Sequence, residues 1–340
     1  MPKPHTPVPT DDPVDATPEE ATPEGFHVPP RLIPAPVSLS ADARRSLHTR
    51  TPAPNFPDLD DLDGWRNLVT TLDAGVGTMI EHLTGSIRSR ITDTEIGGVP
   101  CFTAEPPTIR PKGQNMVILD IHGGGLYQGG GALARALTGV FADIRRLRIV
   151  GIDYRMPPDH PYPAALDDCV TVYRTLLQDY PAESIIFSGA SAGGNLAAAT
   201  ILHARDEGLP LPRGVLLISP EIDLTESGDT FSTLAGIDTL HSLAPVNRLY
   251  ARGHDLTDPL LSPLFANYSD GFPPTYLQSG TRDLYLSNTV RMHRTLRHAG
   301  IPVECHIFEG RPHLGFGGTT PEDLDTLHEQ DHFISTLLGT

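Results

Sequence analysis

Short apolar runs alternate with longer helical patterns over most of the sequence, and this order limits the folds open to the chain. The apolar runs are nearly continuous, which is typical of strands buried on both faces of a parallel sheet. The order predicts an α/β fold, with a mostly parallel central sheet flanked by helices. The runs span 116–121, 149–153, 184–188, 215–219, 275–277 and 303–308, and the helical patterns span 164–178, 192–207, 289–299 and 322–338.

Composition changes along the chain and indicates its domain organisation. Residues 1–30 are rich in Pro, Thr, Asp and Glu and poor in large apolar side chains. Because such a segment buries too little surface to offset its ordering entropy, we expect a disordered Pro-rich tail. Short amphipathic pieces within 31–90 predict cap helices, and the main domain is expected over 91–340. The stretch at about 224–268 interrupts the strand–helix order and is interpreted as a cap insertion.

Charge and cysteine content exclude several classes of function. The chain has 25 Lys and Arg against 42 Asp and Glu, a formal net charge of −17, which repels nucleic-acid backbones and anionic membrane surfaces. Cys101, Cys169 and Cys305 are far apart and match no disulfide or metal-binding pattern. No apolar stretch approaches the ~20 residues of a membrane span, and the first residues lack the apolar run of a signal peptide. A cytoplasmic protein is therefore expected.

A glycine–serine–glycine turn lies between an apolar run and a helical pattern. Gly189-Ala190-Ser191-Ala192-Gly193 directly follows the run 184–188, and the G-x-S-x-G spacing in this context predicts a nucleophile elbow. Glycines permit the tight turn beside the serine. The helix N-terminus behind Ser191 offers free N–H groups to developing negative charge. An ordinary glycine-rich turn is the alternative, and the flanking elements favour the elbow.

A second glycine-rich segment ends the apolar run 116–121. His122-Gly123-Gly124-Gly125 allows backbone N–H groups to approach a substrate oxygen, as in the oxyanion hole that accompanies an elbow. The alternative is a nucleotide-binding loop, but Gln128 stands where G-x-G-x-x-G needs its third glycine. A later match ending at Ala134 lies too far past the strand, and no G-x-x-x-x-G-K-[ST] is present. A nucleotide site is therefore disfavoured.

Two further candidates follow strands nearer the C-terminus. Asp283 comes after the run 275–277, and His313 comes after the run 303–308. Either residue alone after a strand is usually a cap or a surface residue. Together with Ser191 they give the chain order Ser, Asp, His, which is the order that a G-x-S-x-G hydrolase requires. The order and the positions favour a Ser-His-Asp triad.

One motif points to different chemistry. His328-Glu329-Gln330-Asp331-His332 satisfies the H-E-x-x-H pattern of zinc proteases. Zinc also needs a third ligand and an open pocket, and no plausible ligand follows His332. Leu324, Leu327, Ile334 and Leu338 form an apolar stripe on this helix, which would leave its polar residues at the surface. No metal site is predicted.

These segments together resemble the hormone-sensitive-lipase-like (family IV) carboxylesterases, the α/β-hydrolase fold-3 group. The resemblance runs from about residue 90 to the C-terminus. The matching blocks are His122-Gly123-Gly124-Gly125, Asp153-Tyr154-Arg155, His160-Pro161-Tyr162-Pro163-Ala164-Ala165, the elbow with Gly194 and Asn195, Ser219-Pro220 with Asp223, Asp258-Pro259 with Ser262-Pro263-Leu264, and the segments around Asp283 and His313.

The resemblance implies an α/β-hydrolase fold with a helical cap from the N-terminal region and the insertion. It also implies a serine carboxylesterase that needs no cofactor, acts on short-chain acyl esters and forms a homodimer through the sheet edge near 303–308. Lactone hydrolases and natural-product deacetylases use the same triad and remain alternatives, and a non-catalytic ligand-binding homologue is a third. Carried over by position, the triad is Ser191, Asp283 and His313, the oxyanion hole is Gly124, Gly125 and Ala192, and the substrate-pocket candidates are His122, Tyr127 and Glu221.

The sequence departs from the family at two positions. Most members carry Asp or Thr before the nucleophilic serine, and this chain has Ala190, so a side chain that could brace the turn is missing. Many members carry an aromatic residue where this chain has Glu221. A carboxylate at that position is expected to be paired by a neighbouring polar group and structural, and the alternative is a polar specificity residue in the pocket.

Overall fold

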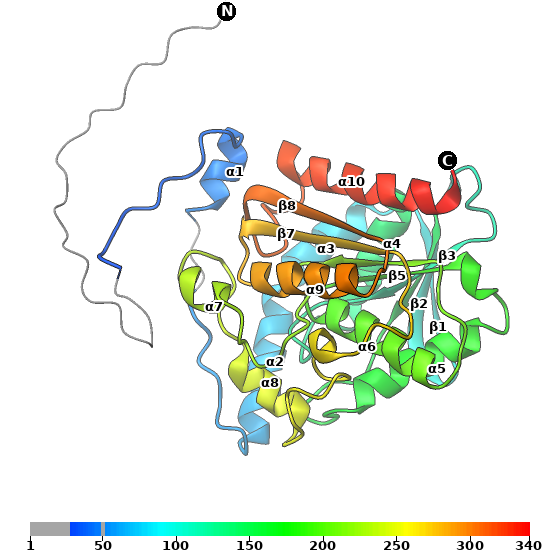
Figure 1. The fold of residues 1–340 in the computed structure, drawn as a ribbon, viewed down its shortest axis with the longest axis horizontal. Coiled ribbons are helices and arrows are strands. Elements are labelled where there is room, and N and C mark those ends of the chain that lie inside the picture. The colour runs from blue at the N-terminus through cyan, green and yellow to red at the C-terminus, as the bar shows by residue number, and fades with distance from the viewer. Residues whose placement is uncertain (1–27, 49–51) are drawn as a thin grey trace, which may run out of the picture. The chain divides into compact units, whose positions relative to one another are not determined.

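The computed structural model describes residues 28–48 and 52–340, and most of the expected tail lies outside them. The chain divides after Ala35 into two units, and the second carries an eight-stranded sheet in the order β1-β2-β4-β3-β5-β6-β7-β8 (Figure 1). The strands are β1 Arg90–Ile96, β2 Val99–Glu105, β3 Val117–Ile121, β4 Arg148–Ile152, β5 Ile185–Ala190, β6 Gly214–Ile218, β7 Thr275–Arg282 and β8 Val303–Pro312.

Six of these strands are parallel, and they are the six that the apolar runs predicted. In the sheet order β4-β3-β5-β6-β7-β8, each strand pairs in parallel with its neighbour. Parallel neighbours require crossover helices, so the helices must cover both faces of the sheet. The mostly parallel sheet expected from the sequence is confirmed. The helices of the second unit are α1 Ala41–Ser46, α2 Leu62–Gly75, α3 Gly77–Ser86, α4 Ala132–Arg145, α5 Ala164–Leu176, α6 Ala192–Asp206, α7 Thr230–Thr233, α8 Ala244–Ala251, α9 Leu286–His298 and α10 Pro321–Leu338, with short 3₁₀ turns at Ala182–Ser184 and Pro263–Phe265.

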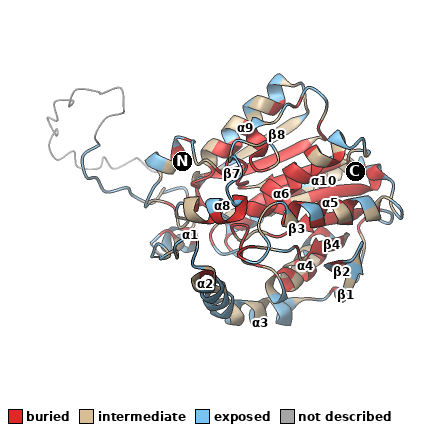
Figure 2. Cartoon of the chain, turned by 90° about the horizontal axis from the view of Figure 1, so that it is seen from below, coloured by how far each residue is buried: buried red, intermediate tan, exposed pale blue. Residues whose placement is uncertain are grey.

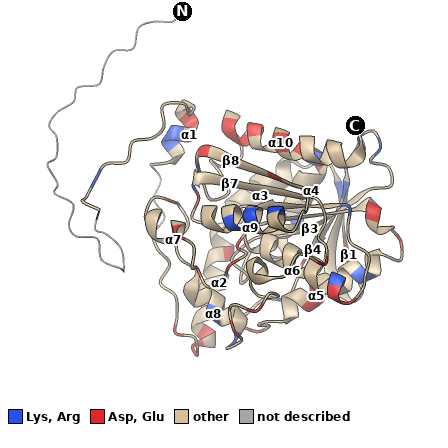
Figure 3. Cartoon of the chain, in the orientation of Figure 1, with Lys and Arg blue, Asp and Glu red and all other residues tan. Residues whose placement is uncertain are grey.

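Two apolar clusters show how the helices divide between the two faces. Along β3, Ile118 belongs to one cluster and Leu119 to the other, because successive strand residues point to opposite faces. The Leu119 side packs against α5, α6 and α9, and the Ile118 side packs against α4 and α10. Buried residues accordingly gather in the strands and in α6 (Figure 2). The positions of Lys, Arg, Asp and Glu along the ribbon lie mainly in helices and loops (Figure 3).

The strands β1 and β2 form an antiparallel hairpin that the sequence analysis did not predict. Ile96 pairs with Val99 across the turn, and β2 continues into an antiparallel pairing with β4. Most of β1 is exposed or only half buried, and its residues mix polar and apolar types. It therefore lacks the continuous apolar run that identified the buried strands.

The N-terminal helices and the insertion share a third apolar cluster, which is separate from both sheet faces. Trp65 of α2 is fully buried there, together with Leu243, Val246 and Leu249 from α8 and its N-cap. Tyr127, from the loop after β3, packs edge-on against Trp65 with ring centroids 6.2 Å apart. The segments 31–90 and 224–268, which we expected to form a cap, thus meet over the loop that follows β3.

Helix length and polarity bear on membrane insertion. Among residues 28–48 and 52–340, no helix combines the length and the apolar character needed to cross a bilayer. The longest helix, α10, begins with a capping box at Thr320 and Asp323, and two acidic residues occupy its first turn, where they favour the positive end of the helix dipole.

Candidate active site

Ser191 lies in a strained turn between β5 and α6. Its backbone has φ 55° and ψ −123°, which is uncommon for a residue with a side chain. The turn is held because the N–H of Ser191 donates to the carbonyl of Ile218 at 2.9 Å. A Cβ on Gly193 would come within 1.9 Å of the Ile121 carbonyl, so only glycine permits α6 to start this close to the end of β3. The hydroxyl is thus fixed at the carboxyl edge of the sheet.

His313 follows β8 directly and faces Ser191. Its Nε2 is 3.0 Å from the Ser191 Oγ, and its Nδ1 is 3.1 Å from an oxygen of Asp283. The imidazole side chain is 7% exposed and the Asp283 side chain is fully buried. The three residues that the sequence selected, which are far apart in the chain, therefore form one continuous hydrogen-bonded chain.

Asp283 lies just after β7 and is held by further donors. The Ser279 hydroxyl donates to its Oδ2 at 2.7 Å, and the N–H of Tyr285 donates to its Oδ1 at 3.0 Å. Burial raises the pKa of this carboxyl, but the charge and hydrogen bond of His313 and the Ser279 bond lower it further, so the net pKa is below its usual value. Asp283 is therefore ionised at neutral pH.

The electrostatic environment of His313 favours its protonated form. Burial lowers the pKa of the imidazole, whereas Asp283, Asp238 and Glu221 raise it, and the net pKa lies above the ordinary value of 6.5. A histidine with a raised pKa, hydrogen-bonded to a hydroxyl on one side and a carboxylate on the other, can accept the hydroxyl proton and be stabilised as imidazolium.

The predicted oxyanion-hole residues lie in the glycine-rich loop after β3 and at the first residue of α6, next to Ser191. Gly123 comes close enough to the elbow that a Cβ there would be 3.4 Å from the Ser191 Cβ. The next residue, Gly124, has φ +124°, and a Cβ on it would lie 2.0 Å from the Gln128 carbonyl oxygen. In the part of the chain that the structure describes, the N–H groups of Gly124, Gly125 and Ala192 donate no hydrogen bond.

Comparisons with known proteins agree with this geometry. The family model of the alpha/beta hydrolase fold matches residues 118–316. An acetyl-hydrolase from Streptomyces hygroscopicus is 33% identical over 238 residues, which cover 68% of this chain and 79% of the relative. The crystal structure of an esterase, E25, has a TM-score of 0.84 at 33% identity, covering 93% of this chain and 99% of that chain. A hormone-sensitive lipase from a metagenome library has a TM-score of 0.69 at 32% identity, covering 80% and 98%.

The chain belongs to the α/β-hydrolase fold family, among the hormone-sensitive-lipase-like carboxylesterases. It is a carboxylic ester hydrolase whose substrates are small-molecule esters. The family assignment made from the sequence is confirmed, and so is the expected α/β-hydrolase fold.

The three residues suggested for the substrate pocket of this esterase have different surroundings. His122 is buried and stacked on Tyr154 at 4.1 Å, and its Nδ1 lies 2.8 Å from the Gly123 carbonyl, so it braces the glycine loop. Tyr127 lies beside Gly125, with a ring carbon 3.2 Å from where a Cβ would stand. Both therefore lie against the glycine-rich loop Gly123–Gly125.

Glu221 of the esterase is 1% exposed, so it does not line an open pocket. Burial raises the pKa of its carboxyl to about 7, although interaction with Tyr285 offsets part of this effect. Among the described residues, neither carboxyl oxygen has a partner at hydrogen-bond geometry. Its N–H donates to the Ser191 carbonyl at 3.1 Å, and its own carbonyl accepts from Asn195 at 2.8 Å. Tyr285 and Asn247 are the neighbouring polar groups whose side chains interact with the carboxyl and lower its pKa against the effect of burial.

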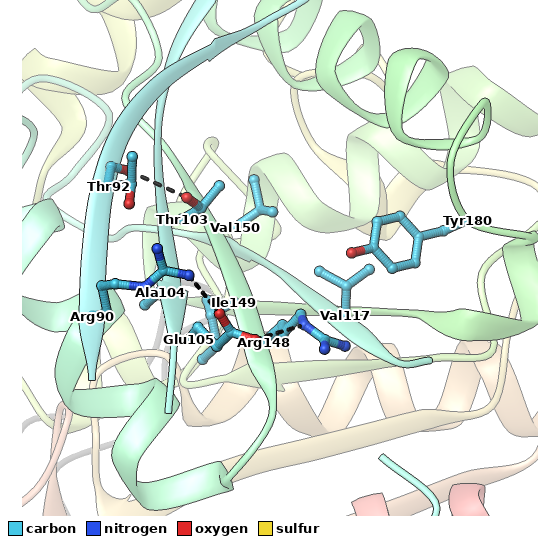
Figure 4. A pocket seen from close by; sticks show the side chains of 10 residues that line it. All are labelled: Arg90, Thr92, Thr103, Ala104, Glu105, Val117, Arg148, Ile149, Val150 and Tyr180. Carbon is cyan, nitrogen blue, oxygen red and sulfur yellow. Dashed lines mark hydrogen bonds and ion pairs between the residues drawn. The ribbon is translucent and has the colours of Figure 1, made fainter. Parts of the chain in front are cut away.

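A surface pocket of the esterase is lined by residues of β1, β2, β3 and β4 (Figure 4). It has a volume of about 170 Å³, and its lining includes Val117 and Arg148, the first residues of β3 and β4. Arg90 bonds to Glu105 across it at 2.7 Å. None of the triad or oxyanion-loop residues lines this pocket. The pocket is therefore separate from the hydrogen-bonded chain of Ser191, His313 and Asp283.

The zinc-protease motif lies on α10 of the esterase. Across residues 28–48 and 52–340, no group of three or more His, Cys, Asp or Glu side chains could hold a metal ion. Glu329 instead approaches the His306 ring at 3.7 Å, and Asp331 pairs with Arg110 at 2.6 Å.

Several residues around the triad of the esterase were not found from the sequence. Asp238 accepts the backbone N–H of His313 at 2.9 Å, and the Tyr285 ring packs edge-on against the imidazole at 4.9 Å. Leu243 approaches Gly125, with a methyl carbon 3.1 Å from an added Cβ. All three occupy loops or a helix cap, where no periodic pattern indicates which side chain turns inward. For Tyr285, the available signal in the sequence was its position two residues after Asp283.

Proposed function

We propose that the chain is a serine carboxylesterase that hydrolyses short-chain acyl esters through Ser191, His313 and Asp283 and an acyl-enzyme intermediate. The observation that carries the proposal is the hydrogen-bonded chain from the Ser191 Oγ through both ring nitrogens of His313 to Asp283, with distances of 3.0 and 3.1 Å. Such a chain is the arrangement that makes a serine hydroxyl nucleophilic.

In the acylation step, the Ser191 Oγ attacks the ester carbonyl carbon while His313 Nε2 takes the hydroxyl proton. The new C–O bond converts the carbonyl into a tetrahedral oxyanion, and Asp283 stabilises the imidazolium. The intermediate then collapses, the bond to the alcohol oxygen breaks, and His313 returns its proton to the leaving alcohol. In deacylation, a water molecule repeats the attack with His313 as base, and the carboxylic acid and free Ser191 are released.

The oxyanion is held by the N–H groups of Gly124, Gly125 and Ala192. Their lack of other partners in the described residues supports this role, because a donor already engaged would have to break a bond first. Ala192 is the first residue of α6, so its N–H also lies at the positive end of a helix dipole. Each such donor typically contributes about 3 kcal/mol to transition-state stabilisation.

The surroundings of the oxyanion loop support small acyl groups. Leu243 and Tyr127 leave no room beyond van der Waals contact beside Gly125, and Trp65 closes the cluster behind Tyr127. A long acyl chain would have to displace these side chains. The acetyl-hydrolase relative also supports an acetyl-sized group. We therefore propose acyl groups of about two to six carbons, because each added methylene needs a space of its own in a packed pocket.

The test compares the enzyme with Ser191→Ala on p-nitrophenyl acetate and butyrate. We expect the wild-type protein to release p-nitrophenol and the variant to lose nearly all of this activity, because alanine offers no nucleophile. A fluorophosphonate should label the wild-type serine covalently and leave the variant unlabelled. An unlabelled wild-type protein, or turnover that survives in Ser191→Ala, would refute the mechanism and favour a non-catalytic homologue.

A further inference from the structure

A buried carboxylate, Asp238, lies between the two loops that carry Asp283 and His313. It is 2% exposed and sits in the turn that follows α7. Its Oδ1 accepts the backbone N–H of His313 at 2.9 Å, and its Oδ2 accepts the backbone N–H of Leu284 at 2.6 Å. One side chain therefore joins His313 itself to the residue next to Asp283.

The hydrogen bonds of Asp238 indicate an ionised carboxylate. The N–H of Thr239 donates to its Oδ1 at 2.6 Å, in addition to the N–H groups of His313 and Leu284. All of these bonds are donated to Asp238, and bonds of this kind are stronger when the acceptor is charged. Burial and the neighbouring charge of Asp283 raise the pKa of Asp238, and the charge of His313 and the two backbone N–H groups offset only part of this, so the net pKa lies above its usual value.

Asp238 is also held firmly from its own side of the site. Thr230, at the start of α7, donates its hydroxyl to the Leu284 carbonyl at 2.7 Å and accepts the N–H of Ser287 at 3.0 Å. The Thr230 N–H donates in turn to the Ser287 hydroxyl at 3.0 Å. The segment that carries Asp238 is therefore fixed to the loop after β7. Through its hydrogen bond to the His313 N–H, the carboxylate holds His313 at a defined position relative to that loop.

We propose that Asp238 is a positioning residue of the ester-hydrolysing site: a second carboxylate that holds the main chain of His313 in register with Asp283. The inference rests on the triad function proposed above. Asp283 fixes only the ring, through Nδ1 at 3.1 Å, whereas Asp238 fixes the backbone of the same residue. Both contacts are needed because a ring displacement of about 1 Å can cost on the order of 100-fold in rate.

Three carboxyl groups from separate elements act on the His313 imidazole. Asp283 comes from the loop after β7, Asp238 from the turn after α7, and Glu221 from the loop after β6. The Tyr285 ring covers one edge without adding charge. Each carboxylate favours the imidazolium, so neutralising Asp238 should make His313 easier to deprotonate. A residue that only stabilised the fold would leave this acid–base property unchanged.

The experiment is Asp238→Asn, assayed on p-nitrophenyl acetate from pH 5 to 9 with active sites counted by fluorophosphonate labelling. An asparagine offers one oxygen and an NH₂ group, so it cannot accept from both His313 and Leu284. We expect kcat per labelled site to fall about 10- to 100-fold, with KM within about threefold of wild type. The acidic limb of the pH profile should move to lower pH.

The matched control is Asp255→Asn. Asp255 is exposed and accepts the backbone N–H of Thr257 at 2.9 Å. Asp255→Asn therefore makes the same chemical change, carboxylate to amide, at a residue outside the triad. It should keep the kcat and the pH profile of the wild type. Wild type and Ser191→Ala are run alongside, so that a failure of the triad mechanism is seen separately. An Asp238→Asn enzyme with kcat within twofold of wild type and an unmoved acidic limb would overturn the positioning role.

A variant that keeps the charge covers the case in which Asp238→Asn does not fold. Asp238→Glu retains the negative charge but displaces the carboxylate by one methylene. The proposal expects its acidic limb to stay near that of the wild type, while kcat falls because both loop contacts shift. Wild-type kcat in Asp238→Glu would contradict the proposal, since the distance between the loops would then not matter.

Discussion

One close ion pair lies at the carboxyl ends of the parallel strands and another lies on the antiparallel hairpin of β1 and β2, and the two pairs differ in what surrounds them. At the carboxyl ends, Asp283 and His313 are 3.1 Å apart with side chains 0% and 7% exposed. On the hairpin, Arg90 and Glu105 are 2.7 Å apart with side chains 77% and 42% exposed. The shorter distance belongs to the pair that water screens more strongly.

Burial, and not distance, therefore decides what each pair does. Water weakens the attraction between exposed charges to a small contribution. In the buried pair, the same kind of contact is strengthened by the low dielectric, and each group strongly biases the protonation of its partner. The comparison implies large effects on activity for the buried pair and small effects on stability for the exposed pair. Three experiments can test it.

The largest effect is expected for Asp283→Asn. The substitution keeps the shape of the side chain but removes the charge that stabilises the imidazolium, and the amide can present an N–H to Nδ1 and select the wrong tautomer. We expect kcat on p-nitrophenyl acetate to fall on the order of 10⁴-fold. The folded state should persist, as judged by circular dichroism. A loss below tenfold would mean that the buried pair does not steer the ring.

The pH dependence of the wild-type enzyme gives an effect of intermediate size. His313 acts as a base only when neutral, and its pKa lies above 6.5 because nearby carboxylates outweigh burial. Activity should therefore be high above this raised pKa and should fall as the pH drops through it. The measurement is kcat/KM from pH 5 to 9, which reports the free enzyme. A midpoint of the acidic limb at or below 6.5 would contradict the electrostatic assignment.

The smallest effect is expected for Arg90→Ala on the hairpin of β1 and β2. The hydrogen bond from Arg90 is the main cause that lowers the pKa of Glu105, but the pair is largely exposed. We expect the free energy of unfolding in urea to change by at most about 1 kcal/mol, with kcat unaltered. A loss of several kcal/mol in the free energy of unfolding would show that solvent exposure does not weaken this pair. The contrast between the buried and the exposed pair would then be wrong.

The sequence predicted the six parallel strands, of which β3 to β7 are largely buried and β8 is mostly half buried. Strands β3 to β8 have continuous apolar runs, and the elbow glycines are required by backbone contacts as short as that of Gly193 with Ile121. Helix α4 was missed although its polar and apolar residues recur with a helical period, and its buried face consists mostly of small residues, among them Ala134, Ala136 and Gly139. Strand β1 was missed because its residues are exposed or half buried and mix polar and apolar types. Strand β2 is largely buried and was missed as well.

The candidate site divides in a similar way. Ser191, Asp283 and His313 occur in motifs or directly after strands, so local order was enough to select them. The position of Asp238 has no such signal, because its importance depends on two backbone N–H groups from loops that only the folded chain brings together. The Glu221 carboxyl was expected to have a partner because buried charges usually do. The polar neighbours that interact with it are Tyr285 and Asn247, which come from other segments of the chain, so the sequence could not name them.

The contact between Gly193 and the Ile121 carbonyl has a consequence for altering substrate range. Gly193, in the serine turn, packs against the carbonyl of Ile121, which directly precedes the glycine-rich loop. A change in the backbone of one segment would therefore disturb the other. If the proposed acyl site lies beside the glycine-rich loop, variation in substrate size is expected to come from the apolar cluster over that loop, at Trp65 on α2 and Leu243 beside α8. Mutant libraries aimed at bulkier esters should be concentrated on these two helices, and the chemical machinery beneath them should be kept invariant.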